Sequence, residues 1–104
     1  MSNVFQALAD PTRREVFALV AQGRARTATE LAAALPVTRQ AVAKHLAILE
    51  DARLVDGQRA GRALRFHATP DPLAEAIAWM AEVGGQWDER LGRLRTAVAE
   101  RDGA

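Results

Sequence analysis

The sequence predicts a mainly α-helical domain that carries one small β-hairpin. Apolar residues recur at the three- and four-residue spacing of helices over most of the 104 residues. Residues 63–68 instead alternate between apolar and polar side chains, which is typical of a half-buried strand. A glycine-containing segment at residues 58–62 precedes them and predicts the turn of a hairpin. At this length we expect one domain that spans residues 1–104.

Charge is distributed unevenly, although the net charge of the chain is only +1. Residues 36–69 carry six basic and three acidic side chains, whereas residues 70–104 carry four basic and seven acidic ones. A basic middle segment favours a surface that binds a polyanion. The chain has no cysteine and no apolar run long enough to cross a membrane. We therefore expect a cytoplasmic protein without disulfides, membrane spans, metals or cofactors.

Two short helices are expected before the basic middle segment. The apolar residues between 4 and 8 have the spacing of a first short helix. Asp10 and Pro11 then provide an N-cap followed by a proline at the first helical position of a second helix. Gly23 is a suitable C-terminal stop, and residues 24–26 are expected to form a connector.

Residues 28–50 predict two further helices with a tight turn between them. Thr27 and Glu30 have the spacing of a capping box, in which each side chain satisfies a free amide at a helix start. Pro36 cannot continue the first helix with a hydrogen bond. Thr38 is a good N-cap for the second helix, because its hydroxyl can accept a hydrogen bond from an amide further along.

The second helix of this pair has two chemically different faces. Val42, Leu46 and Leu49 form a narrow inward stripe. The opposite face combines long polar side chains with alanines, so the helix can lie close to a nucleic acid and reach base edges or phosphates. This pattern is typical of the recognition helix of a helix-turn-helix; an ordinary amphipathic hairpin with a solvated outer face is the alternative. The residues of the polar face are Thr38, Arg39, Gln40, Ala43, Lys44 and Ala47.

Residues 54–68 predict two short strands joined by an arginine-rich turn. After a helix-turn-helix, we interpret such a hairpin as a wing. Arg59 and Arg62 would then contact the phosphate backbone or the minor groove from its tip. The alternative is a hairpin that covers the core and leaves its arginines solvated.

The longest helical pattern covers residues 72–100. Its apolar residues step by four and three in turn, a repeat of about 3.5 residues that is typical of a helix packed lengthwise against another helix. A domain of this size has little room to bury so long a stripe, so a homodimer interface is favoured over packing within one chain. The stripe, here named the C-terminal stripe, comprises Leu73, Ile77, Met80, Gly84, Trp87, Leu91, Leu94 and Val98. The first helix is expected to join this interface through Val4, Phe5 and Leu8.

The order of these elements and several residue runs resemble the ArsR family of bacterial transcriptional regulators. The matching runs are FQALADPTR at 5–13, TELA at 29–32, VTRQAVAKHLAIL at 37–49, and the hairpin between 54 and 62. The tail WDERLGRL at 87–94 is similar to a metal-independent branch of the family, and the absence of cysteine agrees with that branch.

This resemblance implies a winged helix-turn-helix homodimer joined through its first and last helices. Such a dimer binds a near-palindromic operator in double-stranded DNA and usually represses transcription. His45 matches a position often occupied by histidine in the family, and we expect it to pack or to bind a phosphate rather than to contact a base. The implied base-contacting positions are Thr38, Arg39, Gln40 and Lys44, with wing contacts at Arg59 and Arg62.

Two other functions stay open. The chain could be a winged-helix protein-interaction module that has lost DNA recognition and works through the C-terminal stripe. It could also be a metal-responsive repressor with nitrogen and oxygen ligands at His67, Asp71 and Glu75. An enzyme is not expected, because the sequence has no glycine-rich phosphate loop and no convergent set of catalytic side chains.

Two features of the last helix are also left open by the sequence. The glycine pair at 84–85 allows either very close helix contact or a bend. Trp79 lies off the C-terminal stripe, so it either fills the domain core or enlarges the interface. The effector is unknown; a ligand near Trp79, Met80 and Trp87 could change the angle between the two recognition helices.

Overall fold

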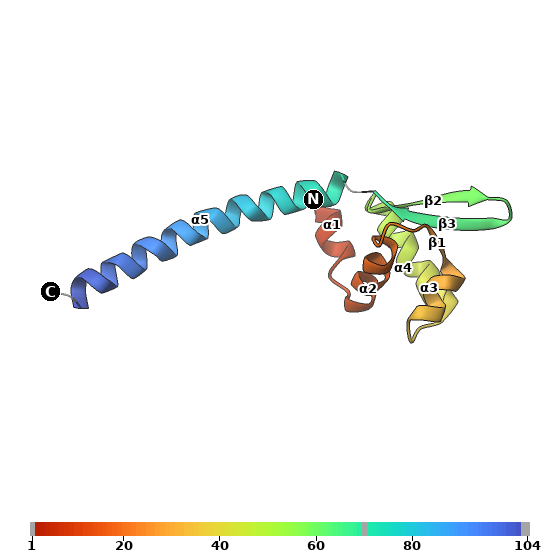
Figure 1. The fold of residues 1–104 in the computed structure, drawn as a ribbon, viewed down its shortest axis with the longest axis horizontal. Helices are drawn as coiled ribbons and strands as arrows, with labels where there is room; N and C mark the ends of the chain where they lie inside the picture. The colour runs from red at the N-terminus through yellow and green to blue at the C-terminus, as the bar shows by residue number, and fades with distance from the viewer. Residues whose placement is uncertain (1, 70, 103–104) are drawn as a thin grey trace. The chain divides into compact units, whose positions relative to one another are not determined.

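The computed structural model of the protein describes residues 2–69 and 71–102. They divide into two compact units, Met1–Ala74 and Glu75–Ala104. The first unit holds four helices and a small sheet, and the second consists of the remainder of the last helix (Figure 1). In chain order the elements are α1 (Ser2–Ala7), α2 (Pro11–Val20), β1 (Arg26–Thr27), α3 (Ala28–Ala34), α4 (Arg39–Asp51), β2 (Val55–Ala60), β3 (Ala63–Ala68) and α5 (Asp71–Asp102).

Helices α2, α3 and α4 begin at the N-cap residues that the sequence predicts. In each case a side-chain oxygen accepts a hydrogen bond from a backbone N–H three residues further on, which satisfies one of the free amides of the first turn. The three bonds are Arg13 N–H to Asp10 Oδ1 at 2.9 Å, Glu30 N–H to Thr27 Oγ1 at 3.1 Å, and Ala41 N–H to Thr38 Oγ1 at 3.1 Å.

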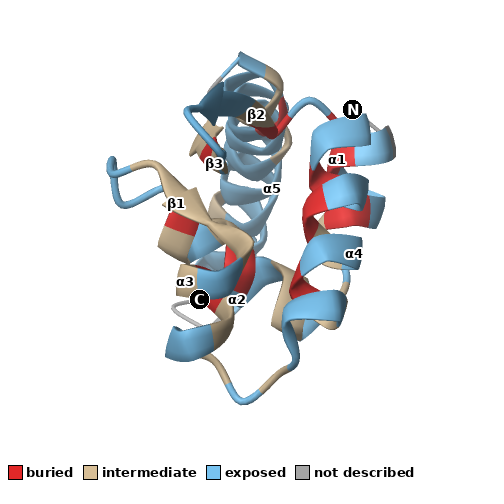
Figure 2. Ribbon diagram, turned by 90° about the vertical axis from the view of Figure 1, so that its right-hand side faces the viewer, coloured by how far each residue is buried: buried red, intermediate tan, exposed pale blue. Residues whose placement is uncertain are grey.

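The core of the first unit forms where α2, α3 and α4 pack together and against the sheet. Figure 2 shows buried residues along one face of α4, while its opposite face is exposed. The predicted inward stripe of Val42, Leu46 and Leu49 is therefore confirmed. The largest fully buried side chains are Val16, Val20, Leu31, Val42, Leu46, Leu49, Leu54 and Val55.

The sheet has three antiparallel strands in the order β1-β3-β2. The sequence predicts only the hairpin and treats residues 24–26 as a connector, which is wrong for Arg26. Arg26 pairs with Phe66 and Thr27 with Arg65, so β1 adds a short third strand to the hairpin. Two residues are too few to show the alternation that identifies a strand.

The hairpin turn is shorter than the sequence predicts. Strand β2 continues to Ala60, which pairs with Ala63, so only Gly61 and Arg62 remain in the turn. Gly61 has a φ of 64°, a left-handed conformation that glycine adopts without steric cost. Arg59, expected at the tip, lies in β2 opposite Leu64.

Helix α5 includes the residues of the predicted last helix and continues through the glycine pair at 84–85 without a break. Trp79 is 45% exposed, so it does not fill the core. No helix in the described part of the chain is both long and apolar enough to cross a membrane.

Candidate nucleic-acid interface

The N-terminal half of α4 presents the predicted polar face to solvent. Thr38, Arg39, Gln40 and Lys44 are all exposed. The Thr38 hydroxyl already accepts the N-cap hydrogen bond of α4, so this residue has a structural role whatever else it contacts. Gln40 and Lys44 make no hydrogen bond or ion pair with other described residues and extend from a rigid helix. These two side chains are therefore free to bind an external partner.

Arg39 differs from its neighbours because α3 holds its side chain. The Arg39 Nε donates a hydrogen bond to Thr29 Oγ1 at 3.1 Å. Thr29 lies in the first turn of α3, which places the guanidinium beside that helix rather than directly outward from α4. Arg39 is thus positioned before any ligand arrives.

A groove with a volume of about 550 Å³ lies between the helix pair and the wing, and we name it the α4–wing groove. Its charged residues are three arginines and one glutamate. The Glu50 carboxylate accepts a hydrogen bond from the Gly57 N–H at 3.0 Å, so it is engaged with the wing backbone. The residues that line the groove are Thr27, Ala28, Thr29, Arg39, Ala43, Leu46, Ala47, Glu50, Arg59, Arg62, Ala63, Leu64 and Phe66.

The two wing arginines of this groove have no counter-charge. Arg59 and Arg62 are exposed, and neither forms a salt bridge or a hydrogen bond with the residues that the structure describes. A groove with three guanidinium groups and one carboxylate carries a net positive charge, which favours a polyanion such as DNA.

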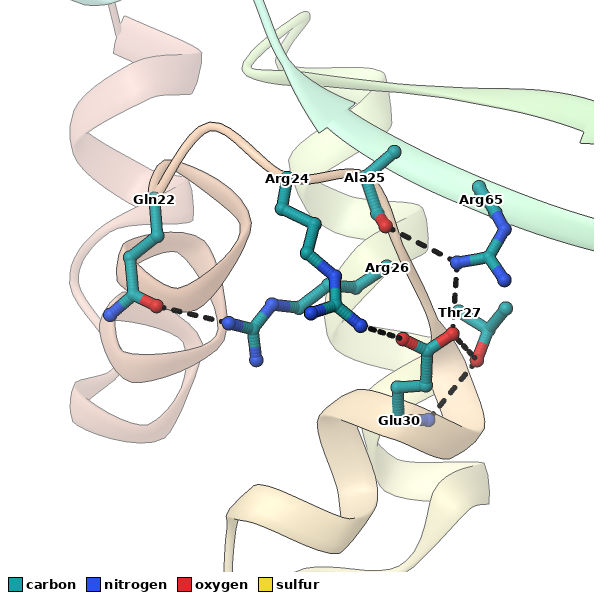
Figure 3. Close-up of polar contacts among 7 residues, drawn as sticks. All are labelled: Gln22, Arg24, Ala25, Arg26, Thr27, Glu30 and Arg65. Carbon is teal, nitrogen blue, oxygen red and sulfur yellow. Dashed lines mark hydrogen bonds and ion pairs between the residues drawn. The ribbon is translucent and has the colours of Figure 1, made fainter.

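The root of the wing is joined to α3 by an ion pair that the sequence does not predict (Figure 3). Arg65 Nη1 lies 2.9 Å from Glu30 Oε1 and donates a second hydrogen bond to the Ala25 carbonyl oxygen at 3.3 Å. Glu30 also accepts a hydrogen bond from the Thr27 hydroxyl at 3.3 Å, and Arg24 lies 3.9 Å away. The capping-box spacing identifies Glu30 only as a local cap; its partner lies in a distant strand.

The charge of Glu30 is stabilised in this cluster. Partial burial acts to raise the pKa of the carboxyl, but the neighbouring Arg65 guanidinium and the hydrogen bonds from Arg65 and Thr27 outweigh it. The pKa of Glu30 is therefore lowered from its usual value, and the ion pair is formed at neutral pH.

His45 occupies a different side of α4 from Gln40 and Lys44. It is half-buried, and its Nδ1 is shielded from solvent without a hydrogen-bond partner among the described residues. It lies near Asp10, whose pKa is lowered mainly by the Arg13 backbone hydrogen bond and further by His45. This position favours packing over base contact.

The residues expected at the dimer interface divide into exposed and buried ones. Phe5 and the large apolar residues of the C-terminal stripe from Ile77 onward are between 40% and 60% exposed. Leu8 and Leu73 are half-buried. Val4 is only 3% exposed and belongs to the core of its own chain, so it offers a partner almost no surface. Helical spacing puts Val4 and Ala7 on the buried face of α1 and leaves Phe5 outside.

The hypothesis of a metal site at His67, Asp71 and Glu75 is not supported. Residues 2–69 and 71–102 contain no group of three or more histidine, aspartate or glutamate side chains that could hold a metal ion. His67 instead faces Asp56 across the hairpin, with Nε2 and Oδ2 3.8 Å apart.

A helix-turn-helix followed by a hairpin with basic residues in and beside its turn defines a winged helix-turn-helix DNA-binding domain. Residues 8–58 match the family model described as a helix-turn-helix domain. The chain is 31% identical over 91 residues to the transcriptional repressor SdpR of Bacillus subtilis, a match that covers 88% of this chain and all of that protein.

Solved structures of similar proteins identify the family to which this fold belongs. An ArsR-like transcriptional regulator from Rhodococcus sp. RHA1 is 36% identical with a TM-score of 0.76, over 91% of this chain and 89% of that one. A homodimeric winged helix-turn-helix DNA-binding domain from Mycobacterium bovis is 25% identical with a TM-score of 0.65, over 82% of this chain and 78% of that one. The chain belongs to the ArsR family of transcriptional regulators; it is a DNA-binding regulator and not an enzyme.

Proposed function

We propose that the protein is a homodimeric repressor that binds a near-palindromic operator. The observation that carries this proposal is the joint exposure of the polar α4 face and the uncompensated wing arginines on one compact unit. Because its ligand is genomic DNA, the proposed location is the cytoplasm. The proposed DNA contacts are Thr38, Arg39, Gln40, Lys44, Arg59 and Arg62, with His45 behind them as a packed residue.

The C-terminal stripe supports a dimer. A single helix cannot bury its own apolar face, and contiguous exposed apolar surface of this kind marks an interaction site. A second copy of the chain offers the same stripe, so two α5 helices can bury each other's apolar residues around a twofold axis. Two recognition helices related by that axis would enter successive major grooves about 34 Å apart.

Sequence-specific binding is tested by electrophoretic shifts and fluorescence anisotropy with the DNA upstream of the protein's own gene. We expect a discrete complex whose affinity falls steeply as salt rises from about 50 to about 200 mM, because arginines displace counterions from phosphates. Gln40→Ala should reduce discrimination between this DNA and a scrambled duplex, whereas Arg62→Ala should weaken both complexes alike. No complex with any promoter fragment at low salt would contradict the proposal.

A protein-interaction module is the second candidate, and the exposed C-terminal stripe is the observation that favours it. In that case another protein, rather than a second copy, would cover α5. The double variant Arg39→Ala with Lys44→Ala separates the two functions. It should abolish operator binding in a DNA-binding repressor and should leave partner binding intact in an interaction module.

A further inference from the structure

Arg39 lies on a different side of α4 from the polar residues Gln40 and Lys44. At about 100° per residue, Gln40 is turned about 100° and Lys44 about 140° around the helix axis from Arg39. Arg39 instead shares its side with Ala43 and Glu50, which are turned only about 40° and about 20° from it and also line the α4–wing groove. Gln40 and Lys44 do not line it.

The hydrogen bond to Thr29 fixes this orientation. The Arg39 Nε–H donates to Thr29 Oγ1 at 3.1 Å. The two terminal nitrogens of the guanidinium make no hydrogen bond to described residues and stay available at the groove. In this orientation the Arg39 guanidinium lies beside α3 and at the groove, which neither Gln40 nor Lys44 lines. The same geometry brings it to the wall opposite Arg59 and Arg62.

The groove itself combines two kinds of surface. Its charged groups are the three arginines on both walls, opposed only by Glu50, which is engaged with the Gly57 N–H. Between them lie apolar side chains. One of these is Leu64 of the wing, which is 41% exposed although it is apolar. Alternating anionic and apolar groups are what a sugar–phosphate backbone presents, with phosphates separated by deoxyribose rings.

We propose that the α4–wing groove binds the sugar–phosphate backbone of one DNA strand, and that Arg39 contacts a phosphate there rather than a base. In this arrangement Arg39 acts from the helix and Arg59 and Arg62 act from the wing on phosphates of the same strand. Leu64 packs against deoxyribose. Thr29 is a positioning residue that holds Arg39 at the groove. This inference rests on the proposed DNA-binding function and assigns base discrimination on α4 to Gln40 and Lys44.

The test compares Arg39→Ala, Thr29→Val and Gln40→Ala, with Arg95→Ala as a control that removes the same charge from α5. Each variant is titrated with two duplexes of about 30 base pairs, one selected by the wild-type protein from a random library and one scrambled. We expect Arg39→Ala to weaken both complexes by the same factor, about 10-fold or more. Thr29→Val should weaken both about 2- to 10-fold. Gln40→Ala should lower the ratio of the two affinities about 5-fold or more.

Salt dependence provides an independent readout. Each lost phosphate contact removes about 0.9 from the slope of log affinity against log salt concentration, so Arg39→Ala should reduce the slope of a dimer by about 2. Circular dichroism melts of each variant show whether the fold is retained. A loss of discrimination in Arg39→Ala without a change of slope would make Arg39 a base-contacting residue and overturn the inference.

Neutral methylphosphonate substitutions locate the contact directly. Replacing the phosphates of the selected duplex one at a time should reveal a position in each half-site where wild-type binding weakens and Arg39→Ala binding does not. Equal losses for both proteins at every position would also overturn the inference. If the wild-type protein selects no duplex at all, the proposed function itself fails, which is a different result from a duplex that binds without using the groove.

Discussion

At the root of the wing, a few individual residues join the hairpin to α3 and α4. Gly57 lies directly opposite Phe66 in the hairpin, and a Cβ on Gly57 would come within 2.9 Å of the Phe66 ring. The Gly57 N–H is bound by Glu50 of α4. The Glu30–Arg65 pair joins α3 to β3, the central strand of the sheet. These contacts on both strands of the hairpin hold Arg59 and Arg62 in place relative to α4.

Gly57→Ala is expected to destabilise the protein by about 1–3 kcal/mol, because the new methyl group would overpack against the buried Phe66 ring. Thermal unfolding at a fixed protein concentration measures the effect. Gly92→Ala is the matched control. Gly92 lies within α5 with open space around its Cβ position, so this change should be neutral or stabilising by up to about 1 kcal/mol. Equal stabilities for the two variants would contradict the packing described at Gly57.

Glu30→Gln should reduce the dependence of stability on acid pH. The folded-state pKa of Glu30 is lowered, so the carboxylate stabilises the protein above its ordinary pKa of about 4.5. That stabilisation is lost as the pH falls through the lowered value. Between about pH 7 and about pH 3, the free energy of unfolding measured in urea should decrease less for Glu30→Gln than for the wild-type protein. Arg65→Gln should reproduce most of this difference; if it leaves the pH dependence unchanged, Arg65 does not stabilise the Glu30 charge.

At the scale of elements, the helices could be predicted from the sequence because their signals are local. The caps Asp10, Thr27 and Thr38 each act within three residues of their own position. Strand β1 and the exact length of the predicted turn around Gly61 could not be predicted, because they depend on pairing partners in β3. The same holds for the interface: exposed polar residues on α4 follow from periodicity, whereas the sideways orientation of Arg39 depends on α3.

The cap at the start of α4 can be separated from DNA contact by substitution. Thr38→Ala removes the hydroxyl that binds the Ala41 N–H and should cost about 1 kcal/mol in the free energy of unfolding. Thr38→Asn retains a capping oxygen and should keep most of the stability. Denaturant unfolding measures both. If Thr38→Asn keeps stability but changes operator discrimination, Thr38 contacts DNA as well as capping the helix; equal stability of all three proteins would exclude the cap as a stabilising contact.

At the scale of the whole molecule, the proposed DNA-binding surface and the proposed dimer surface belong to different units. The first unit carries the polar α4 face and the α4–wing groove, and the second carries the apolar residues of α5 from Ile77 onward. In the proposed dimer, α5 joins two copies and each first unit contacts one half-site. Operator affinity then depends on dimerisation, because one protomer can engage only half of a palindrome.

Leu94→Glu should disrupt the dimer, since a charge would be buried in an apolar interface. Sedimentation equilibrium should show dimer dissociation at least about 10-fold weakened, and operator affinity should fall with it. Gln86→Glu introduces a single negative charge on α5 outside the C-terminal stripe and should leave the dimer intact. A monomeric wild-type protein, or a Leu94→Glu variant that dimerises as well as wild type, would contradict the assignment of the stripe.

The most direct measurement is a hydroxyl-radical footprint of the wild-type protein on the DNA upstream of its own gene. A twofold-symmetric regulator should protect two half-sites whose centres lie about 34 Å, or a multiple of one helical turn, apart. The sequences of the two half-sites should form an inverted repeat. Absence of protection at low salt, or protection that is the same on unrelated DNA, would contradict sequence-specific operator binding.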